Sequence, residues 1–359
     1  MNQMNGVTER EKCLSLLRKG LVIPAHPLAL DINVKLDERS QRAITRYYCD
    51  AGAGGVAVAV HSTQFEIRDP KIGLHRPVLE LALEAVKEYE NSERSIIKIA
   101  GVIGETDQAL KEAALASDLG YDLVLVSLGG LKEKTNDYLI NHLSAVSKVL
   151  PIMAFYLQTA VGGRILDYAF WREAVELSNL VAIKIASFNR YQTLDVIRAV
   201  AESGRSDNIA LYTGNDDNII LDLLGQFHFG EGVGDTPPKF VGGLLGHWAF
   251  WTSKAVEQLE KIHEINAIGS PIKPQLLSLA TKVTDANSAV FDVANNFAGC
   301  IPGINEVLQR QGLMKTNRTL NKSQTLSKGQ SENINRVYSV YPELNDDEFV
   351  KKNLDRWLS

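Results

Sequence analysis

The sequence predicts an α/β protein of the (β/α)8 TIM-barrel class, with a helical subdomain after the barrel. Eight short apolar runs alternate with amphipathic segments of helical length. Several of these runs are apolar at successive positions, as in parallel strands that are buried on both faces. The length of 359 residues suits one such barrel with extensions. An open, doubly wound sheet is the alternative, but it usually has fewer strands and a glycine-rich first turn.

The eight runs are short and rich in β-branched and other apolar residues, and they are residues 21–24, 55–60, 96–102, 123–128, 152–156, 180–186, 209–213 and 240–245. Segments with helical spacing of apolar residues lie between them and include residues 37–51, 76–89, 106–119, 137–149 and 191–203. Because strand and helix alternate eight times, the pattern favours a closed barrel over an open sheet.

After the eighth run the pattern is purely helical, at residues 247–265, 274–282, 284–298 and 304–310. Residues 315–335 are rich in Ser, Asn, Thr and Lys and predict an extended arm, and residues 346–358 predict a last amphipathic helix. That helix either docks, on the barrel or on another subunit, or frays. We therefore expect four parts, namely an N-terminal helical extension (1–20), the barrel (21–265), a C-terminal helical subdomain (266–313), and an arm with a terminal helix (314–359).

Composition excludes several classes of function. The net charge is −5 and the isoelectric point is near 5.9, so no basic field attracts nucleic acid or an anionic membrane. No run approaches the roughly 20 apolar residues of a membrane span, and residues 1–12 carry no apolar signal-peptide stretch. Cys13, Cys49 and Cys300 have no metal-ligand spacing. They fit a reducing, cytoplasmic compartment better than a disulfide framework.

The most informative residue is Lys184, a lone amine inside an apolar run that predicts the sixth strand. Burial disfavours the charged form of a lysine and lowers its pKa. A lysine that is deprotonated near neutral pH can attack a ketone and form a Schiff base. The structural alternative is a lysine at a strand end whose amine reaches water.

Chemistry in a barrel of this class takes place at the carboxyl ends of the strands. Three hydroxyl-bearing residues fall at such ends, namely Ser62, Thr63 and Tyr156. A phenol on the strand next to Lys184 can move protons during imine formation. Ser62 and Thr63 offer hydroxyl and N–H groups to a carboxylate. The structural alternatives are packing for Tyr156 and a simple turn for the other two.

This order of strand ends resembles the N-acetylneuraminate lyase and dihydrodipicolinate synthase superfamily of class I aldolases, over about residues 16–313. The resemblance implies that Lys184 forms an imine with a 2-oxo acid such as pyruvate and that Tyr156 relays protons. It implies also that Ser62 and Thr63 bind the carboxylate of the 2-oxo acid and take part in the proton relay.

The resemblance extends to the last two strands. Gly214 and Asp216 match the turn that follows the family's seventh strand, whose role is mainly architectural. The pair Gly242 and Gly243 matches the region of the eighth strand, and we place Gly243 among the substrate-binding residues.

Departures from the family pattern concern the second substrate. His61 and Gln64 replace glycines of the family's Gly-Thr-Thr-Gly-Glu motif and add polar walls beside the carboxylate site. Residues 128–131 read Leu-Gly-Gly-Leu where the synthases carry a tyrosine pair. The arginine that binds a carboxylated aldehyde has no direct counterpart, and Arg164 takes that role from a shifted position. These changes argue against the synthase reaction of lysine biosynthesis.

We therefore predict a carbon–carbon lyase that joins or separates a 2-oxo acid and an aldehyde through a Schiff base at Lys184. One alternative is dehydration of a sugar-derived 2-oxo acid, and another is a non-catalytic member that only binds a ligand. We expect no cofactor, because imine chemistry needs none, and a homo-oligomer, either a tetramer or a dimer. Closure of the barrel would bring His26, His61 and His247 to one mouth, but without paired spacing we predict no metal site.

Overall fold

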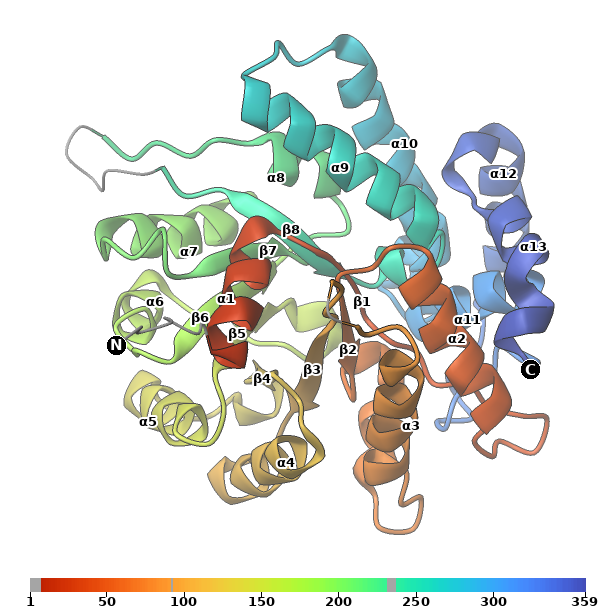
Figure 1. The fold of residues 1–359 in the computed structure, drawn as a ribbon, viewed down its shortest axis with the longest axis horizontal. Coiled ribbons are helices and arrows are strands. Elements are labelled where there is room, and N and C mark those ends of the chain that lie inside the picture. Colours follow the sequence, from red (N-terminus) through yellow and green to blue (C-terminus); the bar gives the residue numbers. More distant parts are fainter. Residues whose placement is uncertain (1–7, 92, 231–236) are drawn as a thin grey trace, which may run out of the picture.

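Eight parallel strands form a ring that helices surround (Figure 1), so the predicted barrel class is confirmed. The computed structural model describes residues 8–91, 93–230 and 237–359. The hydrogen-bonded order is β1-β8-β7-β6-β5-β4-β3-β2. An isolated parallel bridge between Ala25 and Ala57 joins the two outer members of this order and closes the ring.

The strands are three to seven residues long. Each agrees with a predicted run to within about two residues at either end. They are β1 (Val22–Pro24), β2 (Gly55–Val58), β3 (Ile97–Val102), β4 (Leu123–Ser127), β5 (Ile152–Leu157), β6 (Leu180–Ala186), β7 (Ala210–Thr213) and β8 (Phe240–Leu245).

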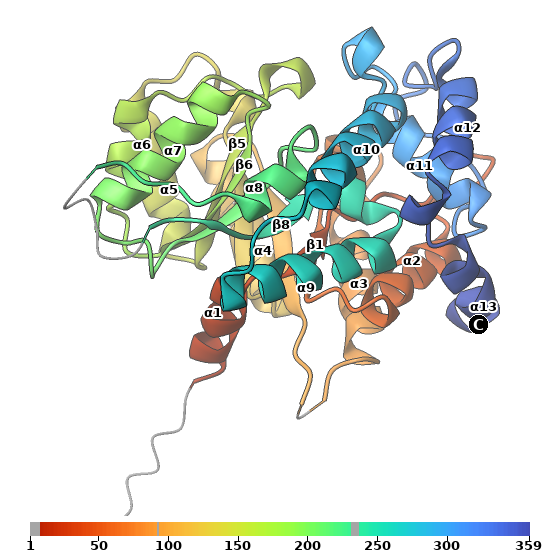
Figure 2. The same ribbon diagram turned by 90° about the horizontal axis from the view of Figure 1, so that it is seen from above.

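One helix precedes the ring and one follows each strand. They are α1 (Glu9–Lys19), α2 (Glu38–Asp50), α3 (His75–Lys87), α4 (Thr106–Leu119), α5 (Asn136–Ser147), α6 (Tyr168–Ala174), α7 (Arg190–Glu202), α8 (Ile219–Leu224) and α9 (Thr252–Ile268). The helices that follow the barrel are α10 (Pro274–Val290), α11 (Cys300–Arg310), α12 (Gln330–Val340) and α13 (Asp347–Trp357). In the view of Figure 2, α10 to α13 gather at one end of the molecule.

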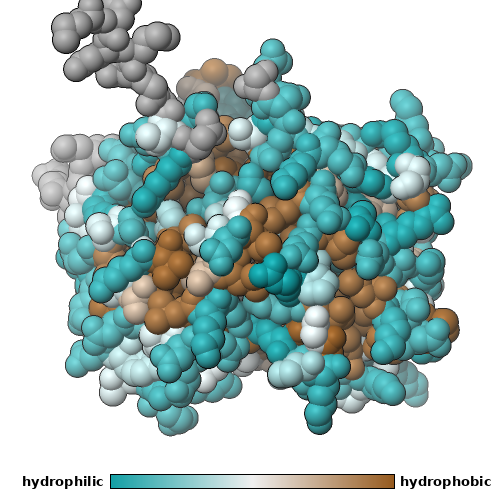
Figure 3. Space-filling view, turned by 60° about the horizontal axis from the view of Figure 1, so that its bottom comes forward, coloured by the Kyte–Doolittle hydropathy of each residue, from teal (hydrophilic) through white to brown (hydrophobic). Residues whose placement is uncertain are grey.

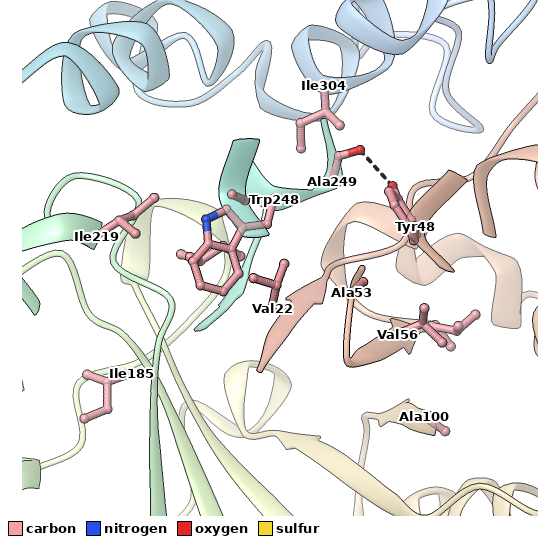
Figure 4. Close-up of a cluster of buried hydrophobic side chains, with 14 of the residues drawn as sticks. Val22, Tyr48, Ala53, Val56, Ala100, Ile185, Ile219, Trp248, Ala249 and Ile304 are labelled. Atoms are coloured by element: carbon pink, nitrogen blue, oxygen red, sulfur yellow. Dashed lines mark hydrogen bonds between the residues drawn. The ribbon is translucent and has the colours of Figure 1, made fainter. Parts of the chain in front are cut away.

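The hydrophobic core has two parts because successive strand residues point to opposite faces of the ring. One cluster fills the inside of the ring, and a larger one lies between the strands and the helices. Figure 4 shows part of the larger cluster, with Trp248 close to Val22. In the same view the hydroxyl of Tyr48 on α2 donates a hydrogen bond to the carbonyl of Ala249, 2.8 Å away.

The C-terminal region differs from the prediction in two places. Residues 274–290 form the single helix α10, where two helices were expected, since nothing at Val283 interrupts the apolar face that packs inward. Part of the predicted arm is helical as well, because α12 begins at Gln330 and buries Ile334 and Val337. The irregular arm is therefore shorter than the sequence suggested.

The last helix, α13, docks on α2. The side chains of Val350 and Trp357 are buried, and the Trp357 ring lies 5.4 Å from the ring of Tyr47 between centroids. The carbonyl of Trp357 accepts a hydrogen bond from the guanidinium of Arg46, 2.7 Å away. The sequence left docking and fraying as alternatives, and the structure shows docking.

The face of the molecule in Figure 3 is mostly hydrophilic. On the face that Figure 3 presents, hydrophobic side chains form separate patches between hydrophilic ones. Within the described ranges, none of the helices combines the length and the apolar character needed to cross a membrane.

We predict that Trp357→Ala lowers the free energy of unfolding by about 3–5 kcal/mol, because it empties a fully buried aromatic site between α13 and α2. The measurement is urea denaturation followed by circular dichroism. Lys352→Ala, at an exposed position of the same helix, is the matched control. A Trp357→Ala change as small as the control would mean that α13 is not docked in solution.

Candidate active site

Lys184 points into the ring from the middle of β6. The inward residues of this strand are Ala182, Lys184 and Ala186, and the register pairs Lys184 with Phe155 on β5. The Lys184 Nζ lies 4.3 Å from the centroid of the Phe155 ring. The lysine side chain is therefore packed against an aromatic face in the upper part of the ring, with only 7% of its surface exposed.

No hydrogen bond or ion pair holds the Lys184 amine within the part of the chain that the structure describes. Burial lowers the pKa of Lys184 below its usual range, and the nearby Asp216 carboxylate partly opposes this shift. The pKa of Asp216 is raised, chiefly by its own burial. Its Oδ1 accepts a hydrogen bond from the main-chain N–H of His247 at 2.9 Å. The amine thus has an anion near it but not in contact, which leaves the nitrogen accessible for attack.

Gly214, at the end of β7, makes room for this amine. A Cβ at position 214 would lie 2.8 Å from the Cε of Lys184 and 2.8 Å from the Cβ of Ala186. Real Cβ atoms do not approach carbon so closely, so the lysine can keep its position only beside glycine. The turn noted in the sequence as architectural therefore has a direct steric role at the amine.

A small cavity of about 60 Å³ opens in front of the amine. Its polar lining consists of His61, Ser62, Gln158, Lys184, Asp216 and Cys300. Its apolar lining comes from the strands, from the loop after β6 and from the C-terminal helical region, through Ala25, Val60, Phe155, Leu157, Val161, Ala186, Phe188, Phe291, Phe297 and Ile304. The site is thus a small, mainly apolar chamber with few polar groups, as is typical of small-molecule sites.

Two strained residues meet at this cavity. Phe188 and Phe297 both have positive φ angles, 51° and 65°, which are rare for bulky side chains. Their rings form an edge-to-face contact with centroids 5.7 Å apart. Strain of this kind persists only where the surroundings enforce it, and it is concentrated at functional sites. The contact joins the loop after β6 to the segment between α10 and α11.

A second cavity of about 420 Å³ adjoins the first, and His61, Leu157 and Val161 line both. Its other lining residues are Gln64, Phe65, Glu66, Ile103, Gly104, Ser127, Gly129, Gly130, Gly162, Ile301 and Gln324. Gly104, Gly129 and Gly162, which follow β3, β4 and β5, carry no side chain and so leave this space open. No lysine or arginine is among these lining residues.

Tyr156 does not face Lys184, so the prediction that it lies beside the amine is wrong. Its ring packs against Trp171 on α6, with centroids 5.6 Å apart, and its hydroxyl accepts a hydrogen bond from the N–H of Leu166. The reason is the two-residue period of a strand, because Phe155 is the residue in register with Lys184 and its neighbour must point outward. The sequence placed Tyr156 on the correct strand but could not fix its face.

Ser62 lines the first cavity, whereas Thr63 is buried behind it and lines neither cavity. The hydroxyl of Ser62 donates a hydrogen bond to the carbonyl of Ala25 at 2.8 Å, and that of Thr63 donates to the carbonyl of His26 at 2.6 Å. Both hydroxyl protons therefore hold the short 3-10 turn His61–Thr63 against the loop after β1. This geometry does not support the predicted part of Thr63 in a proton relay.

His61 lines both cavities, and Gln64 lines the second. His61 is partly exposed. Gln64 is buried, and its Oε1 accepts a hydrogen bond from the N–H of Leu320 in the C-terminal arm at 2.7 Å. The Nε2 of Gln64 has no partner, so this side chain still has a donor to offer.

Arg164 and Gly243 lie away from the cavities, which contradicts the predicted substrate contacts. The guanidinium of Arg164 donates hydrogen bonds to the carbonyls of Leu131 and Lys134 and so braces the loop after β4. Gly243 is packed in β8, where a Cβ would lie 2.7 Å from the Trp248 ring. Its role is close packing between strand and side chain.

The three histidines considered for a metal do not form one site. The two ring nitrogens of His26 form hydrogen bonds with the carbonyl of Pro27 and with the hydroxyl of Thr45, both at 2.8 Å. The ring of His247 packs edge-to-face on Phe250. Among the described residues, no group of three or more His, Cys, Asp or Glu is arranged to hold a metal ion.

Sequence reasoning missed the groups that come from beyond the barrel. Phe297, Cys300 and Ile301 reach the chambers from the region around α11, and Gln324 reaches the second chamber from the arm. No local motif marks them, because their position depends on how the C-terminal region folds back over the barrel. Phe155 was also overlooked. It precedes Tyr156 in the same apolar run, and the composition of that run does not show which of the two side chains points into the ring.

No protein-family model matches the chain. By sequence it is similar to the 4-hydroxy-tetrahydrodipicolinate synthase of Alkaliphilus oremlandii, with 32% identity over 117 residues. This stretch covers 32% of the chain and 38% of that relative, so the match spans about two fifths of the relative's length.

By structure the chain is similar to the dihydrodipicolinate synthase of Oceanobacillus iheyensis, with a TM-score of 0.71 and 17% identity over 92% of this chain and 99% of that chain. It is similar also to the dihydrodipicolinate synthase of Acinetobacter baumannii solved with pyruvate, with a TM-score of 0.70 and 17% identity over 89% of this chain and 98% of that chain. The sequence relative and the structural neighbours carry the same family name at low identity, and the structural likeness shows that the chain shares their barrel fold.

Proposed function

We propose that the protein is a carbon–carbon lyase of the class I aldolase type that binds a 2-oxo acid as a Schiff base on Lys184. The observation that carries the proposal is a buried amine at the wall of a small cavity, with no hydrogen bond or ion pair to it from the described residues. The Acinetobacter baumannii neighbour, which was solved with pyruvate, supports a 2-oxo acid as the ligand. A purely ligand-binding protein would gain stability by replacing such an amine with an apolar residue.

The chemistry follows from the lowered pKa of Lys184. The deprotonated Nζ attacks the C2 carbonyl of the 2-oxo acid, and the carbinolamine then loses water to give an imine, which takes up one proton from the solvent to become the protonated imine. The imine withdraws electrons, so a C3–C4 bond can break with its electron pair delocalised into an enamine, and the reverse step forms that bond. In the cleavage direction, the C4 hydroxyl of the substrate loses its proton as it becomes the carbonyl of the aldehyde.

The first cavity has the size of a small 2-oxo acid. Its volume of about 60 Å³ gives room for about four to six water-sized groups at roughly 10–15 Å³ each. We place the carboxylate of the acid beside Ser62, on the turn after β2, and C3 toward the second cavity. The apolar wall around Phe155 keeps water from the imine, which protects it from hydrolysis.

The second cavity indicates the class of the other substrate. It offers the unpartnered Nε2 of Gln64, the hydroxyl of Ser127 and the carboxylate of Glu66, and no lysine or arginine. A carboxylated or phosphorylated aldehyde would lose its hydration there without gaining a cation. We therefore propose an uncharged, hydroxylated aldehyde.

The second candidate function is dehydration of a sugar-derived 2-oxo acid. The polar lining of the second cavity, without lysine or arginine, favours this function too. The hydroxylated tail of such an acid would occupy the second cavity, while its carboxylate end occupies the first. The two reactions share the imine and differ in whether carbon or hydroxide leaves. Analysis of the products, as an aldehyde or as water and a deoxy-2-oxo acid, distinguishes them.

We predict that incubation with pyruvate and sodium borohydride attaches one pyruvate-derived group to the protein at Lys184. Intact-mass measurement followed by peptide mapping checks this result. Lys184→Met should abolish the adduct, whereas Lys98→Met should keep it, because Lys98 is paired with Glu90 outside the cavity. Absence of any adduct across a panel of 2-oxo acids, with the protein folded, would overturn the proposed function.

We predict that Asp216→Asn shifts the pH dependence of imine formation toward lower pH. Lys184 attacks only when deprotonated, and the Asp216 carboxylate raises the pKa of the amine, so loss of that charge lowers the pKa further. The rate of cyanoborohydride trapping as a function of pH measures the shift. Asp355→Asn, at an exposed carboxylate on α13 outside the cavity lining, should leave the profile in place. A shift toward higher pH would contradict the assigned electrostatics.

We predict that, with pyruvate, the protein uses glyceraldehyde better than carboxylated or phosphorylated aldehydes, by at least about tenfold in kcat/KM, which corresponds to ~1.4 kcal/mol. Gly130→Leu should raise the KM for glyceraldehyde, since a side chain there meets no atom within 4 Å and extends into open space. Lys132→Leu, exposed just after the same turn, is the control. Preference for a charged aldehyde would contradict the assignment of the second cavity.

A further inference from the structure

Imine chemistry at Lys184 needs a group that takes and returns protons at C3 and at the aldehyde oxygen. The residues first expected to do this are not available. The ring in contact with the amine is Phe155, which has no hydroxyl, and the hydroxyl of Tyr156 lies on the opposite face of β5. The hydroxyls of Ser62 and Thr63 donate to main-chain carbonyls. Another group must therefore move the protons.

The titratable side chains that line the first cavity are His61, Lys184, Asp216 and Cys300, and those that line the second are His61 and Glu66. His61 is thus the titratable residue that the two linings share. The bond between C3 of the 2-oxo acid and the aldehyde carbon has to form where the cavities meet. Asp216 and Cys300 line the first cavity but not the second.

The imidazole of His61 is held in place but keeps its nitrogens free. Its ring makes an edge-to-face contact with the ring of Phe65, with centroids 5.9 Å apart. Within the described residues, neither ring nitrogen of His61 forms a hydrogen bond with the protein. An imidazole that is fixed by packing and has open nitrogens is suited to a substrate contact.

The charge state of His61 suits a base. Burial, with a smaller contribution from the Lys184 charge, lowers the pKa of His61 to about 4, so the free protein carries a neutral imidazole with one unprotonated nitrogen. A bound 2-oxo acid brings a carboxylate next to this ring. That negative charge raises the affinity of the imidazole for a proton, so basicity increases when substrate is present.

We propose that His61 is the catalytic acid–base residue of the Lys184 centre, a role that rests on the proposed Schiff-base function. An unprotonated nitrogen of the imidazole takes a proton from C3 of the imine. The C3–H electron pair forms the C2=C3 bond of the enamine, and the C2=N pair moves onto nitrogen. The enamine carbon then bonds to the aldehyde carbon, and the imidazolium gives its proton to the aldehyde oxygen, so that His61 ends neutral as it began.

The test separates imine formation from proton transfer. The wild-type protein is incubated with pyruvate in deuterium oxide, and exchange of the C3 hydrogens is followed by proton NMR, while borohydride trapping reports the imine. We expect His61→Gln to exchange at least about 100-fold more slowly, since general acid–base groups contribute factors of this order. Trapping at Lys184 should persist in this variant, and circular dichroism should show the same fold.

Two further variants distinguish a catalytic role from a structural one. His61→Ala should regain exchange when free imidazole is added, which a merely structural histidine would not permit. If Asp216→Asn loses exchange while His61→Gln keeps it, Asp216 is the base and the proposal is overturned. Unchanged exchange in His61→Gln, with the adduct formed, overturns the role of His61 alone. A wild-type protein without any adduct overturns the Schiff-base function itself.

Discussion

The burial of the Lys184 amine inside a closed ring of strands is the constraint on which the site depends. An amine in this position is costly to charge, and among the described residues no hydrogen bond or ion pair to it repays that cost. The structure accommodates it with the aromatic face of Phe155, with the space that Gly214 leaves beside Cε, and with an aspartate that is near but not bonded to it. Each of these features keeps the nitrogen in place and available to react.

The chambers in front of the amine are built by parts of the chain that are distant in sequence. The strand ends supply the reactive side chains, but Phe297 and Ile301 close the space from the C-terminal helical region. The N–H of Leu320 fixes the side chain of Gln64 from the arm. Strain at Phe188 and Phe297 shows that this closure is enforced by packing. The region after the barrel therefore completes the site as well as the fold.

The fold could be predicted from the sequence to a large extent, because buried parallel strands leave continuous apolar runs and helices leave a 3.6-residue period. Lys184 stood out for the same reason, as a charge inside such a run. The face of Tyr156 could not be predicted, because a shift of one residue reverses every side chain of a strand and the run around Phe155 permits either register. The positions of Arg164 and of the arm residues depend on tertiary packing, so no local sequence pattern predicts these positions.

The most direct test of the central claim is a crystal structure of the protein soaked with pyruvate. We expect a covalent bond between C2 of pyruvate and Nζ of Lys184, with the carboxylate beside Ser62, C3 toward His61, and the second cavity still open. A free Lys184 amine at saturating pyruvate, with the ligand absent from this cavity or bound elsewhere, would contradict the account.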